Sequence, residues 1–136
     1  MSKAKEIKLE IPCNAASVSI ARKALEGFAI QLGLADEVID DLKLAVGEIC
    51  TNAVKFGCPG ADNICIRYRV KSDHLEIEVR NQGDFFPQEK QTPTKPQIEN
   101  LPVGGLGLYL ADQVMDELAI TSEGGHTTVR MSKRLR

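Results

Sequence analysis

The residues best suited to chemistry in this chain are Glu48 and Asn52, within a long amphipathic stretch from about Asp36 to Gly57. In a helix, this spacing places the two side chains one turn apart on the same face. They border an apolar stripe made of Val38, Leu42, Ala45, Ile49, Ala53 and Phe56. Polar groups at the edge of a buried face are costly unless they are bonded or used. The pair is therefore either a structural pair that bonds neighbouring loops or part of a site.

The second feature is the run Gly104-Gly105-Leu106-Gly107, which precedes a predicted helix through about Asp116. Glycines at the start of a helix let backbone N–H groups approach an anion, and the helix dipole favours negative charge there. The run lacks the Gly-Lys-Ser/Thr of a P-loop and does not follow a strand as the dinucleotide motif requires. It is either a phosphate-binding loop or a flexible connector.

If the two features form one site, their chemistry suits phosphoryl transfer. Asn52 offers an oxygen ligand to Mg²⁺, and Glu48 can orient or deprotonate an attacking hydroxyl. Asn81 follows a predicted strand and can meet a base edge, while Gly83 leaves room for the ring. The stretch 84–103 has four prolines and no periodicity, so we expect a lid that excludes water or a disordered segment.

Hydrophobic periodicity predicts the order β-α-α-β-β-lid-α-β-β. Alternating strand faces carry Ile7, Leu9 and Ile11, then Ile64, Ile66, Tyr68 and Val70, then Leu75, Ile77 and Val79. The first helix repeats Val18, Ala21, Leu25, Phe28 and Leu32, with Asn14 or Ser17 as its cap and Gly33 as its stop. We expect Lys71 to His74 as one turn and a final hairpin, 118–120 with 127–131, around Gly124-Gly125. The fold class is α+β, a two-layer sandwich with helices on one face of a mostly antiparallel sheet.

The composition also argues against several classes of function, namely nucleic-acid binding, membrane insertion and metal binding by cysteines. The 136 residues fit a single domain over 1–136, and the net charge of −2 offers no basic footprint for nucleic acid. There is no apolar run long enough for a membrane span and no signal peptide, so we expect a cytoplasmic protein. Four cysteines without a Cys-x-x-Cys spacing suggest buried reduced thiols rather than a metal site.

Five motifs in register resemble the GHKL ATPase superfamily, and more narrowly the bacterial anti-sigma-factor serine kinases. They are Glu48 before TNAVKFG, then NQG, TKPQIE, GGLGLYLA and HTTVRM, and the resemblance spans about Ile7 to Met131. It implies the Bergerat α/β sandwich, ATP and Mg²⁺ beneath a mobile lid, and a homodimer. It also implies that the protein sequesters a sigma factor and phosphorylates a serine of an anti-anti-sigma protein of the STAS type.

The resemblance also implies roles for individual residues. Glu48 matches the catalytic glutamate, Asn52 the Mg²⁺-binding asparagine and Arg22 a position that contacts protein partners. The nucleotide-binding positions are Asn52, Asn81, Gly83, Lys95, Gly104, Gly105, Gly107 and Thr127, with Lys95 in the lid and Thr127 near the adenine. A solvated helix residue is the alternative for Arg22.

This sequence departs from the family pattern at several positions. Asn81 stands where the family has an adenine-reading aspartate, and the second glycine of its Asp-x-Gly-x-Gly motif is absent. Phe56 replaces a frequent histidine, and His126 a frequent glycine. A neutral carboxamide accepts a weaker hydrogen bond than a carboxylate, which we expect to cost about 1–2 kcal/mol of ATP binding.

Two functions of different classes follow. The first is an ATP-dependent serine kinase that is also an anti-sigma factor. The alternative is a protein-binding switch of the same fold that binds nucleotide weakly or is catalytically inactive, which Asn81 favours. A kinase in a signalling switch other than transcription fits the same residues.

Overall fold

The computed structural model describes residues 5–56, 63–82 and 105–135. In chain order its elements are β1 (Glu6–Pro12), α1 (Ser17–Gln31), α2 (Asp36–Phe56), β2 (Asn63–Lys71), β3 (His74–Gln82), α3 (Gly105–Val114), β4 (Glu117–Glu123) and β5 (His126–Arg134). The predicted order of elements is confirmed. The predicted lid at 84–103 lies outside the described residues.

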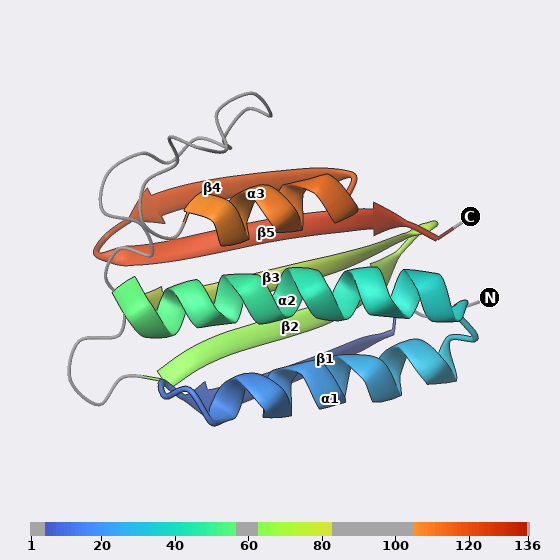
Figure 1. Ribbon diagram of the computed structural model, residues 1–136, viewed down its shortest axis with the longest axis horizontal. Helices are drawn as coiled ribbons and strands as arrows, with labels where there is room; N and C mark the ends of the chain where they lie inside the picture. The colour runs from blue at the N-terminus through green and yellow to red at the C-terminus, as the bar shows by residue number, and fades with distance from the viewer. Residues whose placement is uncertain (1–4, 57–62, 83–104, 136) are drawn as a thin grey trace.

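The strands form one antiparallel sheet in the order β1-β2-β3-β5-β4. All three helices lie on one face of this sheet, with α2 between α1 and α3 (Figure 1). The predicted α+β two-layer sandwich is therefore confirmed. None of the helices in the described ranges combines the length and apolarity needed to cross a membrane.

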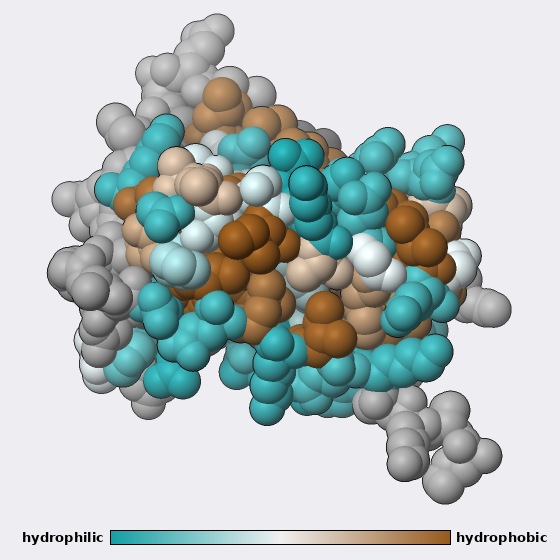
Figure 2. All heavy atoms as spheres, turned by 90° about the horizontal axis from the view of Figure 1, so that it is seen from below, coloured by the Kyte–Doolittle hydropathy of each residue, from teal (hydrophilic) through white to brown (hydrophobic). Residues whose placement is uncertain are grey.

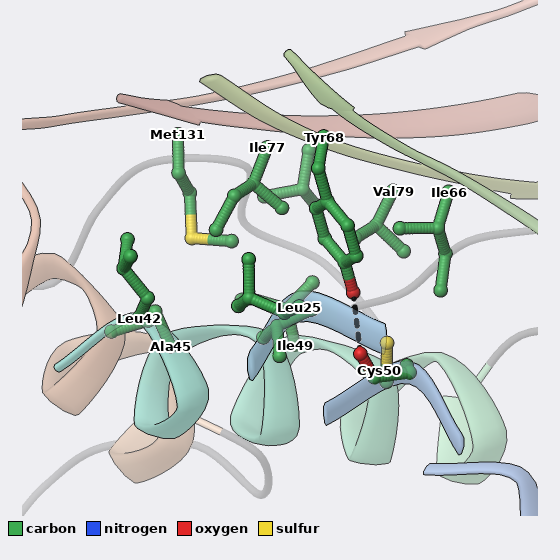
Figure 3. Packing of buried hydrophobic residues seen from close by; sticks show 14 of the residues in the cluster. Leu25, Leu42, Ala45, Ile49, Cys50, Ile66, Tyr68, Ile77, Val79 and Met131 are labelled. Carbon is green, nitrogen blue, oxygen red and sulfur yellow. Dashed lines mark hydrogen bonds between the residues drawn. The ribbon is translucent and has the colours of Figure 1, made fainter. Parts of the chain in front are cut away.

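The core lies between the two layers because each strand turns its apolar side chains toward the helices. Ile64, Ile66 and Tyr68 of β2 are buried there, as predicted from their alternation. The Tyr68 side chain points toward the helices, and its hydroxyl donates a hydrogen bond to the Ala21 carbonyl of α1 at 2.9 Å (Figure 3). This bond attaches α1 to the middle of β2.

The ends of α1 follow local chemistry. Its N-cap position is Ala16, not Asn14 or Ser17, and no side chain caps it directly. Asn14, two residues before Ala16, bonds the first helical residue instead, since its Oδ1 accepts hydrogen bonds from the Ser17 N–H and hydroxyl, both at 3.0 Å. Gly33, with φ of 76°, ends the helix in the left-handed region as predicted.

Three connections differ from the sequence-based boundaries. The β2–β3 turn has only two residues, Ser72 and Asp73, and Ser72 has φ of 57°. Helix α3 ends at Val114, before Asp116, because the Asp116 N–H already bonds the Ser132 carbonyl of β5. The last hairpin is longer than predicted, since its turn at Gly124-Gly125 allows pairing along all of β4.

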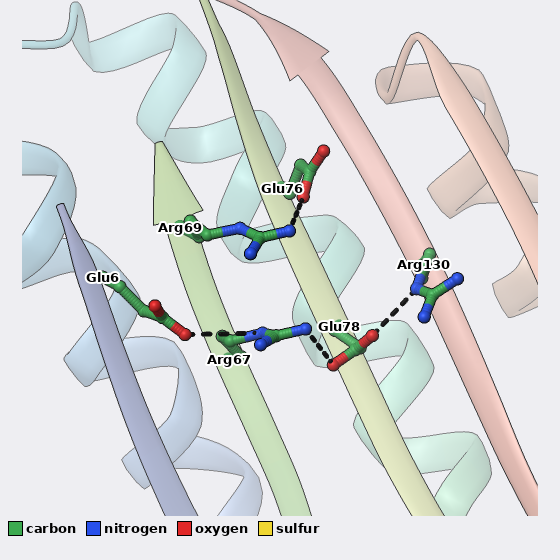
Figure 4. A network of polar contacts seen from close by, with 6 residues as sticks. All are labelled: Glu6, Arg67, Arg69, Glu76, Glu78 and Arg130. Carbon is green, nitrogen blue, oxygen red and sulfur yellow. Dashed lines mark hydrogen bonds and ion pairs between the residues drawn. The ribbon is translucent and has the colours of Figure 1, made fainter. Parts of the chain in front are cut away.

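The helix-free face of the sheet carries ion pairs between neighbouring strands. Arg67 contacts Glu6 at 3.5 Å and Glu78 at 2.9 Å, and Glu78 contacts Arg130 at 2.8 Å (Figure 4). Arg69 pairs with Glu76 at 2.8 Å. These charges are largely paired with one another, which suits a solvated face.

The cysteines only partly follow the prediction. Cys50 is a free buried thiol, as expected, and Cys65 is a free thiol but exposed. Cys13 is disulfide-bonded, so the prediction of reduced thiols is wrong there. Sequence spacing does not show which cysteines the fold brings within bonding reach.

Candidate functional site

Glu48 and Asn52 lie on the central helix, on the side of α2 that faces α3. Glu48 is partly buried and Asn52 is 4% exposed, so both border the core as their position on the helical wheel predicts. They are four residues apart, which places the carboxylate and the carboxamide one turn apart on α2. Both groups therefore project toward the start of α3.

Gly107, in the first turn of α3, lies against this pair. A Cβ atom built on Gly107 would lie 2.7 Å from Glu48 Oε1 and 3.7 Å from Asn52 Oδ1. The shorter distance is below the contact limit for real Cβ atoms, so any side chain here would displace Glu48 or α3. Gly107 and the Glu48–Asn52 pair, which are far apart in the sequence, therefore meet at one place.

The start of α3 has the electrostatics of an anion site. Its first helical residue is Gly105, and its first turn contains no acidic residue. The backbone N–H groups of a first helical turn have no partner within the helix, and the dipole places partial positive charge there. An anion at this helix start would lie near the Asn52 carboxamide and also near the Glu48 carboxylate, so a cation bound with the anion would offset their repulsion.

Asn81 and Thr127 lie together on the inner face of the sheet. Asn81 in β3 is opposite Thr127 in β5, and they are 2% and 1% exposed. The Thr127 hydroxyl is 3.4 Å from that of Ser122 in β4. The carboxyl end of β3 is at the same end of the molecule as the C-terminus of α2 and the N-terminus of α3 (Figure 1). These buried polar side chains thus share the end of the molecule that holds Glu48 and Asn52.

Arg22 is not part of this cluster. It is an exposed residue of α1, on the opposite flank of α2 from α3 (Figure 1). Its side chain lies across α2 at Gly47, where an added Cβ would lie 3.2 Å from Arg22 Cδ and 3.5 Å from Nε. Gly47 was not singled out by the sequence, because periodicity does not fix the register of one helix against another.

Other expected site residues lie outside the described residues. They are Gly83, Lys95 and Gly104, together with the expected lid. Within the described ranges, no group of three His, Cys, Asp or Glu side chains could hold a metal. A cation at this end would take the Asn52 oxygen and few other protein ligands, which suits Mg²⁺ bound mainly by phosphate and water.

Cys50, which lies between Glu48 and Asn52 in sequence, does not share their chemistry. It is fully buried, and desolvation raises the pKa of its thiol to about 12. A thiol with this pKa stays neutral near pH 7 and is a poor nucleophile. Its role is packing between α2 and the sheet, beside Tyr68 (Figure 3).

Residues 11–133 match the family described as "Histidine kinase-like ATPase domain". Several curated relatives named "Serine-protein kinase RsbW" are similar over most of their length. The chain is 40% identical to the one from Bacillus licheniformis and 39% identical to the one from Bacillus velezensis, with 95% of this chain and 85% of the relative covered in both cases. The relative from Bacillus subtilis is 38% identical over the same shares.

Solved structures support the fold. The RsbU and RsbW domains of Rv1364c from Mycobacterium tuberculosis match with a TM-score of 0.74 at 18% identity, covering 96% of this chain and 32% of that chain. The histidine kinase domain of the blue-light activated kinase EL346 from Erythrobacter litoralis matches with a TM-score of 0.54 at 23% identity, covering 92% and 62%. This chain spans about a third of the first of these two longer chains.

Proposed function

This chain belongs to the histidine kinase-like ATPase domain family and is a protein serine kinase, and we propose that it acts as an anti-sigma factor. In this proposal it transfers the γ-phosphoryl group of ATP to a serine of a STAS-type anti-anti-sigma protein and sequesters a sigma factor. It works in the cytoplasm as a homodimer. The observation that carries the proposal is the approach of Gly107 to Glu48 and Asn52, because it joins an anion-binding helix start to a carboxylate and an oxygen ligand.

Each residue in this proposal has a role that its chemistry allows. The first-turn N–H groups of α3, with Gly104, Gly105 and Gly107, bind the phosphates. The Asn52 oxygen holds Mg²⁺, whose charge offsets that of the phosphates when it is bound. Glu48 orients the serine hydroxyl and accepts its proton, as a carboxylate does in phosphoryl transfer.

The contacts with the adenine ring and the segment expected to form the lid complete the proposed site. Asn81 accepts a hydrogen bond from the adenine amino group, with Thr127 and Gly83 beside the ring. The segment 84–103 covers the nucleotide and excludes water, and Lys95 contributes a positive charge to the phosphates.

The test is phosphorylation of purified STAS-type proteins from the source organism with γ-labelled ATP. We expect Glu48→Gln to reduce transfer at least about a hundredfold, because the substitution removes the proton acceptor and keeps the size of the side chain. ADP affinity, measured by calorimetry, stays close to the wild-type value in this variant. Transfer at the wild-type rate by Glu48→Gln would remove Glu48 from the mechanism.

A second function is favoured by Asn81, a buried carboxamide where the family carries a carboxylate. In this alternative the chain is a protein-binding switch with weak nucleotide chemistry. Calorimetric titration with ADP and a non-hydrolysable ATP analogue, with and without Mg²⁺, separates the two. Micromolar binding that Mg²⁺ strengthens supports the kinase, whereas no binding at millimolar nucleotide supports the switch.

A further inference from the structure

Cys13 lies in the connection between β1 and α1, at the same end of the molecule as the C-terminus of α2 (Figure 1). It is disulfide-bonded, whereas Cys50 and Cys65 are free thiols. The chain has only one other cysteine, Cys58, so Cys58 is the partner by elimination, although it lies outside the described residues. The bond therefore joins the residue that follows β1 to the segment that follows α2 in the sequence.

The sulfur of Cys13 also lies against α2 itself. Its Sγ is 3.9 Å from the carbonyl oxygen of Ala53. Ala53 is buried, begins the last turn of α2 and directly follows Asn52. The disulfide thus lies beside the helical turn that determines where the Asn52 side chain is held.

This corner of the molecule has few other restraints. β1 is an edge strand that pairs with β2 alone, and helix ends fray more readily than helix centres. Figure 2 looks onto the side formed by α1 and β1, where polar and apolar side chains are mixed at the surface. Cys13 is partly exposed there, between the exposed residues Pro12 and Asn14. A covalent bond at this place restrains the end of α2, and a small reductant has access to it.

The bond is also of a kind that cells reverse. In the cytoplasm proposed above, disulfides are uncommon, and most of them are transient or redox-sensing. A dithiol reductant breaks the S–S bond and gives the two sulfur atoms two electrons and two protons, while its own two thiols become a disulfide. The remaining cysteines are poorly placed to exchange with this bond, because Cys50 is buried and Cys65 points to the helix-free face of the sheet.

We infer that the disulfide of Cys13 is a redox switch for nucleotide binding: the oxidised form holds the end of α2 in place, and reduction by a dithiol releases this end and weakens binding of Mg²⁺ and its nucleotide at Asn52. The inference rests on the proposed function, because it takes Asn52 as the Mg²⁺ ligand. In the reduced form the Cys13 thiol is only a weak hydrogen-bond donor to the Ala53 carbonyl, so the last turn of α2 opens more often. Nucleotide affinity falls with the fraction of molecules in which this turn is formed.

The test measures the affinity of the full chain for ADP with Mg²⁺ by calorimetry, after oxidation in air and after treatment with dithiothreitol. We expect the Kd of the reduced wild type to be about threefold to tenfold higher, as when the turn is formed in roughly a third to a tenth of the molecules. Thiol labelling of the unfolded protein finds two free thiols in the oxidised sample and four in the reduced one. Equal Kd values for the two forms, or four thiols in the oxidised sample, overturn the inference.

Two serine variants assign the effect to one bond. Cys13→Ser removes the disulfide and keeps a small donor near the Ala53 carbonyl, so its Kd equals that of the reduced wild type and does not respond to dithiothreitol. Cys65→Ser is the matched control, because Cys65 is a free, exposed thiol on another part of the sheet, and this variant behaves as the wild type in both conditions. A Kd of Cys13→Ser that still responds to dithiothreitol contradicts the assignment to Cys13.

Hydrogen exchange separates failure of the switch from failure of the proposed function. If the wild type binds no nucleotide in either form, the proposed function fails, and exchange of the α2 amides still tests the release of the helix end. Amides near Ala53 exchange about threefold to tenfold faster in the reduced wild type, and those near Ala45 in the middle of α2 do not change. Cys13→Ser shows no difference between the two conditions. Equal exchange near Ala53 in oxidised and reduced wild type excludes the switch.

Discussion

Gly107 has no side chain, and this allows the first turn of α3 to lie against Glu48 and Asn52. The sequence placed these residues in separate segments and left open whether they meet. In the structure, Glu48 Oε1 occupies the space next to the α-carbon of Gly107. A carboxylate on one helix and a glycine on another thus depend on each other for their positions.

We predict that Gly107→Ala lowers phosphoryl transfer about tenfold to a hundredfold. The added Cβ would lie 2.7 Å from Glu48 Oε1, so the carboxylate must move away from its working position. Displacements of about 1 Å at a reacting group cost rates of this order. The measurement is kcat for the protein substrate, with circular dichroism to show that the variant is folded.

Gly27→Ala is the control for this change, because alanine meets no neighbour there and favours the helix. Wild-type kcat in Gly107→Ala would mean that Glu48 tolerates the shift or takes no part in the reaction.

In the proposed site, Asn81 determines the strength of the hydrogen bond with the adenine amino group. We predict that Asn81→Asp tightens ATP binding by about 1–2 kcal/mol, or roughly fivefold to thirtyfold in Kd, since a charged acceptor forms the stronger hydrogen bond. Calorimetry with ATP and with GTP gives the comparison. The gain is confined to ATP, because guanine presents a carbonyl where adenine presents its amino group. Equal gains for both nucleotides, or none, would contradict the assigned contact.

At the scale of elements, α1 is attached to the sheet through Tyr68. Burial raises the pKa of its hydroxyl well above the usual range, so the group remains a neutral donor to the Ala21 carbonyl. We predict that Tyr68→Phe destabilises the protein by about 1 kcal/mol, the typical net value of one such bond. The melting temperature then falls by about 3–5 °C.

Tyr109→Phe is the matched control, because Tyr109 is half-buried in α3 and has no hydrogen-bonding partner in the described part of the chain. Thermal denaturation of both variants makes the comparison. Equal melting temperatures for the two variants would show that the Tyr68 bond contributes nothing net.

Helices, strands and their buried faces could be predicted from the sequence where a single local pattern determines them. Alternation in β2 and β3 and the stripe on α2 follow from one buried face each, so the burial of most of these residues was correctly predicted. Val38 and Val70, near the ends of their elements, are only partly buried. The C-terminus of α3 was not, because a hydrogen bond from Asp116 to Ser132 of β5 ends it. The contact of Arg22 with Gly47 depends on the register between two helices, which periodicity leaves undetermined. The residues of the candidate site could thus be named, but not their mutual distances.

At the scale of the whole molecule, the two faces differ in character. The helical layer carries Glu48, Asn52, Arg22 and the exposed apolar side chains. The outer face of the sheet holds ion pairs that cross from β1 to β5 through β2 and β3. Because those charges are paired within the molecule, this face offers little to a charged partner, and its contribution is to stability.

The pair of Arg69 and Glu76 makes this contribution dependent on pH. The hydrogen bond from Arg69 holds the pKa of Glu76 below its ordinary value of 4.5. The folded state therefore binds fewer protons than the unfolded state in this range, and the stabilisation is complete above that ordinary value. This stabilisation is lost as the pH falls through the lowered pKa that Glu76 has in the folded protein.

We predict a coupling between Arg69 and Glu76 of about 0.2–1 kcal/mol at pH 7, the usual size for a partly exposed pair. The double-mutant cycle of Arg69→Gln and Glu76→Gln, followed by urea denaturation at pH 7, 5 and 3, measures it. The coupling is retained at pH 5, above the ordinary pKa of 4.5, and decreases as the pH falls below that value. It also weakens in high salt, since the pair is only partly buried. A coupling that is the same at pH 7 and pH 3 would show that the contact is not ionic and that the ion pairs of this face do not govern acid stability.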